Sequence, residues 1–121
     1  MIDILPESES DALAVVITGE LTSEDYAKLE PELELRADRP DDFDLLVEIS
    51  GIEGLEPAAI REDLRFATEY GSHIGRMAVV TDEPLWQGVS DLVGKPLGML
   101  IGADVERFDD RVEAWKWLRE S

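Results

Sequence analysis

Cysteine is absent from this chain of 121 residues, and histidine occurs once, as His73. Without cysteine there is no disulfide, no thiolate nucleophile and no metal site built on sulfur ligands. His73 follows Gly71 and Ser72, so we expect it in a surface loop. No second histidine stands elsewhere in the sequence to complete a metal site with it. The sequence therefore predicts neither a metal ion nor a cofactor.

Basic residues are scarce. Lysine and arginine number 11 against 29 aspartates and glutamates, which gives a formal net charge of -18. Nucleic acid is excluded as a partner because phosphate binding needs a basic patch, and lysine and arginine form no cluster here. Repulsion among the carboxylates destabilises a compact fold in dilute buffer, whereas salt at about 1 M shortens the Debye length to about 3 Å. We expect a halophilic protein; the alternative is an ordinary acidic surface that serves solubility.

Long apolar runs are absent as well. No stretch of about 18 apolar residues is present to span a bilayer. Residues 1–6 lack the basic start and the apolar stretch of a signal peptide. We expect a cytoplasmic protein. No repeat or linker divides the sequence, so residues 1–121 are expected to form one domain.

Five short apolar segments have the length and composition of strands. They are residues 2–5, 12–17, 45–49, 77–80 and 105–108. The polar turn after the first segment is short enough to pair the first two strands antiparallel, with the first at an edge of the sheet. The remaining strands alternate with helical segments, which makes the sheet mostly parallel. The predicted fold is α/β, with a five-stranded sheet and about four helices.

Helix signals lie between these strands. Thr22 can cap the first helix, and Asp25 lies in its first turn, where the helix dipole favours an anion. Pro31 lies inside this helix, and we expect a kink or a break there. The other helices are expected at residues 57–70, from residue 84 and from residue 109, the last with Val112, Trp115 and Leu118 repeating at helical spacing.

The junction between the central strand and the second helix is a candidate interaction site. Ser50 ends the strand, Gly51 and Gly54 are expected to form a loop, and Glu56 precedes the helix that Pro57 opens. Ligands of open α/β sheets bind at such carboxyl ends of strands. The two glycines lack the spacing and the following lysine of a phosphate-binding loop, so we interpret them as turn residues.

Residues 84–101 form an unusually apolar segment. Its candidate contacts with a ligand or a membrane are Leu85, Trp86, Val89, Leu92, Val93 and Leu97. Glycines and a proline interrupt the segment, so it is expected to act as a lid over an apolar cavity or to lie against lipid. The alternative is a stripe that packs entirely onto the sheet as core.

The junction resembles that of STAS domains, the anti-sigma-factor antagonists. In that family a strand ending like residues 48–51 precedes an Asp-Ser-Ser-Gly turn that accepts a phosphate. Here the turn reads Glu56-Pro57-Ala58-Ala59, so neither serine is present. The resemblance therefore implies that the phosphorylation switch of the family cannot operate at this turn.

The sequence is more specifically similar to the SpoIIAA-like relatives of STAS domains. The similarity lies in the order of several short stretches, which are residues 19–22, 25–26, Pro31 with Leu33, and residues 77–82, 86–87 and 113–118. It implies a non-catalytic α/β domain, related in shape to CRAL-TRIO lipid-binding domains, that holds apolar ligands or touches membranes.

Three functions follow as hypotheses. The first is a non-catalytic domain that binds an apolar small molecule, a lipid-like ligand or a membrane surface, and so associates peripherally with membranes. The second is a phosphorylation-independent module that binds a protein partner, and a homodimer is left open. The third, an enzyme, would use carboxylates expected near strand ends, which are Asp25, Glu48, Glu56 and Asp82. In a chain with 29 acidic residues such neighbours arise by chance, and we expect no enzyme.

Overall fold

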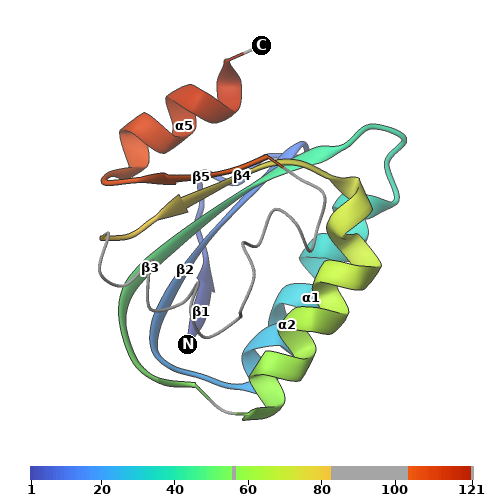
Figure 1. Ribbon diagram of the computed structural model, residues 1–121. Helices are drawn as coiled ribbons and strands as arrows, with labels where there is room; N and C mark the ends of the chain where they lie inside the picture. Colours follow the sequence, from blue (N-terminus) through green and yellow to red (C-terminus); the bar gives the residue numbers. More distant parts are fainter. Residues whose placement is uncertain (56, 83–103, 121) are drawn as a thin grey trace.

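The computed structural model describes residues 1–55, 57–82 and 104–120 (Figure 1). The strands are β1 (Ile2–Ile4), β2 (Ala12–Leu21), β3 (Phe43–Leu55), β4 (Ile74–Val80) and β5 (Asp104–Phe108). The helices are α1 (Ser23–Ala37), α2 (Pro57–Tyr70), the short 3-10 helix η1 (Gly71–His73) and α5 (Arg111–Arg119). The helix expected from residue 84 lies outside the described residues.

The strands form one sheet in the order β1-β2-β3-β4-β5. β1 pairs antiparallel with β2, and every later pair is parallel. This confirms the predicted α/β fold with an antiparallel N-terminal edge strand and a mostly parallel remainder. Each parallel connection crosses over through a helix where the structure describes it, as parallel strands require.

Helices cover both faces of the sheet (Figure 1). On one face α1 and α2 bury Tyr26, Leu33 and Phe66 against Leu13 and Val15 of β2. On the other face α5 covers a second core cluster, which consists of Ala14, Leu46, Ala78, Val80, Ala114 and Leu118. Side chains alternate between the faces along a strand. Because both faces are buried, the side chains on both sides of these strands are apolar, which explains the continuous apolar runs in the sequence.

The start of α1 depends on Asp25. Its carboxylate accepts hydrogen bonds from the Thr22 N–H at 2.9 Å, from the Thr22 hydroxyl at 3.1 Å and from the Ile2 N–H at 3.3 Å. Burial acts against ionisation, but the hydrogen bonds from Thr22 outweigh it and lower the pKa of Asp25. The sequence correctly assigned Thr22 and Asp25 to the beginning of this helix.

Two local expectations need correction. α1 runs without a break through Pro31, because Leu29 and Leu33 anchor the helix in the core on either side of that residue. Tertiary packing thus overrides the local cost of a proline in a helix. His73 lies in η1 and is half-buried, rather than in an exposed loop.

Candidate interaction site

The carboxyl end of β3 extends well beyond its neighbour β4. The last pair between the two strands is Glu48 with Val80, whereas pairing with β2 continues as far as Leu55. Within the described residues, the end of β3 therefore forms a two-stranded ribbon with β2. Figure 1 shows the two strands curving together toward the starts of α1 and α2. Ser50, Gly51 and Glu53 are exposed on this ribbon.

A glycine in each strand bends the ribbon. Gly19 in β2 has a φ of +63° and Gly51 in β3 has a φ of +79°, and the register between the strands shifts around Gly19. Glycine adopts such angles without the steric cost that a side chain adds, which is how a strand accommodates a bulge. The prediction that Gly51 and Gly54 form a loop was wrong, because β3 continues through both, and Gly54 pairs with Glu20.

The junction passes from the ribbon into α2. Pro57 is the first residue of α2, as predicted, and the first turn of the helix has no acidic residue. Ala58 is half-buried and Ala59 is buried. Glu56, a predicted member of this site, lies outside the described residues. Of the predicted junction residues, the structure thus brings Ser50, Gly51 and Gly54 together on one ribbon.

On the α5 face, Glu48 belongs to a cluster that the sequence did not reveal. Its carboxylate accepts a hydrogen bond from Arg111 at 2.8 Å, and Arg111 also donates to Glu7 at 2.9 Å. Glu7 in turn accepts from the Trp115 indole N–H at 2.7 Å. The hydrogen bond from Arg111 to Glu48 is the main reason that the pKa of Arg111 is raised. Since Arg111 begins α5, this cluster fixes the helix to β3 and to the turn after β1.

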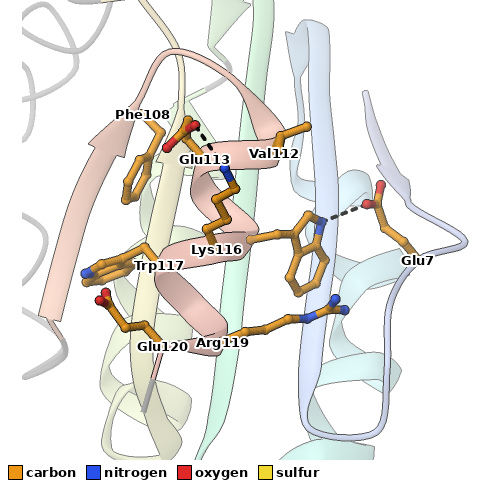
Figure 2. A pocket seen from close by; sticks show the side chains of 9 residues that line it. Glu7, Phe108, Val112, Glu113, Lys116, Trp117, Arg119 and Glu120 are labelled. Atoms are coloured by element: carbon orange, nitrogen blue, oxygen red, sulfur yellow. Dashed lines mark hydrogen bonds and ion pairs between the residues drawn. The ribbon is translucent and has the colours of Figure 1, made fainter.

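Each of the two tryptophans of α5 packs against an arginine side chain. The guanidinium carbon of Arg119 lies 4.7 Å from the ring centroid of Trp115, and that of Arg76 lies 5.1 Å from that of Trp117. Trp117 also packs against Phe108, with 5.5 Å between ring centroids. Figure 2 shows Trp117 and Phe108 on one side of α5 and Glu7 on the other. These contacts hold both partly buried indole rings in place beside the core under α5.

Above α5 lies a hollow of about 920 Å³ that is open to solvent. The outward residue Val112 lines it and is 65% exposed, whereas Leu118 of the same helical repeat is buried. Residues on both sides of the helix also line it, among them Glu7, Phe108, Trp115 and Trp117. The hollow is therefore a wide, open depression around α5 that does not enclose a small molecule.

The remaining predicted site residues are not brought together by the described part of the structure. Leu85, Trp86, Val89, Leu92, Val93 and Leu97 lie outside the described residues. Asp25 stabilises the start of α1, and Glu48 is paired with Arg111. Among the described residues there is no group of three side chains that could hold a metal ion. No helix in the described ranges has the length and apolar character needed to cross a bilayer.

The sheet order and the helices on both faces define an α/β domain with a mostly parallel five-stranded sheet. The family model described as SpoIIAA-like matches residues 12–119, and the chain belongs to this SpoIIAA-like family. The fold is also similar to the crystal structure of an uncharacterized protein from Shewanella loihica PV-4 with a SpoIIAA-like fold. That similarity has a TM-score of 0.77 and 26% sequence identity, and it covers 97% of this chain and 93% of the other. No curated protein matches the chain.

Proposed function

We propose that this protein is a non-catalytic, phosphorylation-independent module that binds a protein partner through the junction of β3 and α2. The observation that carries the proposal is the exposed ribbon at the end of β3, where Ser50, Gly51 and Glu53 face solvent beyond the last pair with β4. Membership of a family with the fold of anti-sigma-factor antagonists supports a role in protein recognition.

The ribbon is suited to recognition because its shape is set before a partner arrives. β3 is paired with β2 up to Leu55, and the glycine bulges fix the direction of the bend. A surface that is ordered in the free protein loses little conformational entropy on binding. Glu20 and Glu53 are both exposed on the ribbon, and Glu20 lies opposite Gly54, next to Glu53. The partner surface is expected to be basic where it meets these carboxylates.

The first turn of α2 lacks the serines that carry the phosphorylation switch in anti-sigma-factor antagonists. Pro57, Ala58 and Ala59 carry no hydroxyl group, so the first turn of α2 has no acceptor for a phosphate. Phosphorylation adds a charge of about −1.5 to −2 at neutral pH and would add repulsion on so acidic a surface. A partner is therefore expected to bind the unmodified protein.

The test begins with a photo-crosslinking amino acid at position 50, used in the native host, with the exposed Ser72 of η1 as the matched control position. A partner crosslinked from position 50 alone is then purified, and its affinity is measured. Glu53→Arg is expected to weaken binding by about tenfold, which is the effect of losing roughly 1.4 kcal/mol. Glu106→Arg, an exposed charge reversal on β5, is expected to change the affinity less than about twofold. Equal losses in the two variants would mean that net charge, and not the junction, determines binding.

Binding of an apolar ligand or a lipid surface is the second candidate. Its support is the apolar sequence of residues 84–101, with Leu85, Trp86 and Val89 among the proposed contacts. The two candidates separate experimentally, because the junction variants alter binding to a protein partner and leave any response to vesicles unchanged.

A further inference from the structure

The side chain of Thr81 carries the only buried polar atom without a hydrogen-bond partner in the described part of the chain. Thr81 is 5% exposed, and its hydroxyl group neither donates nor accepts a hydrogen bond among the described residues. Its backbone is satisfied, because the N–H donates to the Phe108 carbonyl at 3.1 Å and the carbonyl accepts from the Arg107 guanidinium at 2.9 Å. Only the hydroxyl group is therefore left unpaired.

Thr81 lies at the carboxyl end of β4. It follows directly after Val80, the last residue of the strand, and β4 has a parallel neighbour on each side. Val80 belongs to the core cluster under α5, so the side chain of Thr81 is on the opposite face of the sheet, which α1 and α2 cover. Ligands of open α/β sheets bind outside the carboxyl ends of the strands. The unpaired hydroxyl group is thus at the end of the sheet where a ligand is expected.

Valine would fit the same position without an unpaired hydroxyl group, because the two side chains have nearly the same size and shape. The two preceding residues, Val79 and Val80, are valines that are buried as deeply as Thr81. A buried hydroxyl group without a partner destabilises the fold, since it has lost its hydrogen bonds to water. The threonine therefore costs stability in the free protein, and a buried polar group of this kind requires a physical explanation.

The surroundings of Thr81 indicate the chemistry of a missing partner. On the same face of the sheet, Val79 precedes Thr81 and pairs with Val47, which belongs to the apolar core under α1 and α2. Arg107, which contacts the Thr81 carbonyl, is already ion-paired with Asp109 at 2.8 Å, so its charge is matched within the chain. A hydroxyl group both donates and accepts hydrogen bonds. An uncharged hydroxyl or carbonyl group on an apolar molecule suits these surroundings.

We propose that the Thr81 hydroxyl group is the hydrogen-bonding contact for an uncharged hydroxyl or carbonyl group of an otherwise apolar small molecule, bound at the carboxyl end of β4. The proposal rests on the second candidate function, binding of an apolar ligand, and assigns to it a residue and a polar group. Thr81 makes the binding selective, because a molecule of the same shape without the polar group leaves the buried hydroxyl group unpaired.

The stability of the free protein provides the first test. Thr81→Val should raise the melting temperature by about 4 °C, because it removes the unpaired hydroxyl group. The matched control is Thr18→Val in β2, where Thr18 is only half-buried, and it should change the melting temperature by less than about 1 °C. A Thr81→Val variant that is less stable than the wild type would overturn the proposal, because the hydroxyl group would then already have a partner, such as a water molecule, in the free protein.

Octanol and octane are the probes of the second test, because they share one carbon chain and differ in a single hydroxyl group. Each is titrated into the full chain, and the shifts of the backbone amide NMR signals give the dissociation constants. The wild type should prefer octanol, and the ratio of the octane to the octanol dissociation constant should fall about tenfold in Thr81→Val. Thr81→Ser, which keeps the hydroxyl group, and Thr18→Val should change this ratio less than about twofold. Circular dichroism checks that each variant retains its fold.

The outcomes separate this inference from the functions on which it depends. If both probes bind and Thr81→Val leaves the ratio unchanged, the role of Thr81 is overturned, while binding of an apolar ligand stands. If neither probe binds up to its solubility limit, both are overturned. Recognition of a protein partner is unaffected by either result, because the variants at the end of β3 test it separately.

Discussion

Arg111 and Glu48 are separated by 63 residues in the sequence and joined by a hydrogen bond of 2.8 Å. The pair connects the first residue of α5 to the last residue of β3 that pairs with β4. It therefore links α5 to the base of the candidate interaction site, because the exposed end of β3 begins directly after Glu48.

The first prediction concerns this pair. Arg111→Met should lower the free energy of unfolding by about 1 kcal/mol, because Glu48 and Glu7 lose their shared partner in a partly buried site. The side chains of Arg111 and Glu48 are 37% and 22% exposed, which places the expected effect between those of surface and buried pairs. Urea unfolding provides the measurement. Adding Glu48→Gln to the arginine variant should recover part of the loss.

A matched control for Arg111→Met is Lys116→Met, which removes an ion pair between Lys116 and Glu113. The side chains of these two residues are 71% and 58% exposed. That substitution should cost less than about 0.5 kcal/mol. If both variants are equally stable, the Arg111 cluster contributes nothing to the attachment of α5.

The second prediction concerns the bulge. Gly51→Ala should destabilise the protein by roughly 1–2 kcal/mol, because alanine is strained at a φ of +79°. A Cβ atom at this position meets nothing within 4 Å, so the loss would report backbone strain and not a clash. Thermal unfolding is compared with that of Ser50→Ala, the adjacent exposed position, which should change stability by less than about 0.5 kcal/mol. A fully stable Gly51→Ala variant would argue against the bulged conformation.

The length of β3 could not be predicted from the sequence. The expected strand at residues 45–49 was found, yet β3 runs from Phe43 to Leu55. Its last part contains two glycines and the exposed Glu53, and such residues are rare in regular strands. The bulge makes them compatible with pairing, and a bulge leaves no alternating apolar pattern in the sequence. The apolar runs buried on both faces predicted the sheet, but the residues nearest the candidate site did not follow that pattern.

The α5 cluster was missed for a different reason. Glu7, Glu48 and Arg111 come from three distant segments, and nothing in the local sequence links one acidic residue to a particular arginine. Only the sheet order brings the turn after β1, the end of β3 and the start of α5 together. Periodicity likewise placed Val112, Trp115 and Leu118 on one helix, but their different exposures depend on how α5 lies on the sheet.

The third prediction concerns the pH dependence of stability. Burial raises the pKa of Asp44, and a hydrogen bond from the Arg76 N–H to its carboxylate offsets this only in part. A carboxyl group with a raised pKa in the folded state is more easily protonated there than in the unfolded chain, so its ionised form lowers stability above that pKa. Asp44→Asn should therefore stabilise the protein at pH 7 by up to about 1 kcal/mol. The asparagine oxygen can still accept the hydrogen bond from Arg76.

The advantage of Asp44→Asn should shrink as the pH falls through the raised pKa toward the ordinary value of about 4, because the wild-type carboxyl group takes up a proton. Urea unfolding from pH 7 to about pH 4 gives the comparison. An advantage that stays constant over this range would show that the charge of Asp44 is not its cause.

The fourth prediction concerns salt. With a net charge of -18, the melting temperature should rise as KCl increases from dilute buffer to about 1 M and beyond, because screening reduces repulsion among carboxylates. A variant in which the exposed residues Asp41, Glu53 and Glu106 are replaced by their amides should show a smaller rise. A melting temperature that is flat or falls with KCl would contradict a halophilic adaptation.

The last prediction tests the apolar segment of residues 84–101. Anionic lipid is repelled by the charge of the chain, so any membrane contact must come from apolar burial at about 25 cal/mol per Å². If Leu85, Trp86 and Val89 reach lipid, neutral vesicles or long-chain fatty acids in high salt should shift tryptophan emission to the blue, and Trp86→Ala should remove most of that shift. Trp115 and Trp117 act as internal controls, because the first donates to Glu7 and the second packs against Phe108. A blue shift that survives Trp86→Ala would assign the signal to the tryptophans of α5. An unchanged spectrum without co-sedimentation would mean that no apolar burial holds the molecule on a bilayer. Protein recognition at the junction would then be the better explanation.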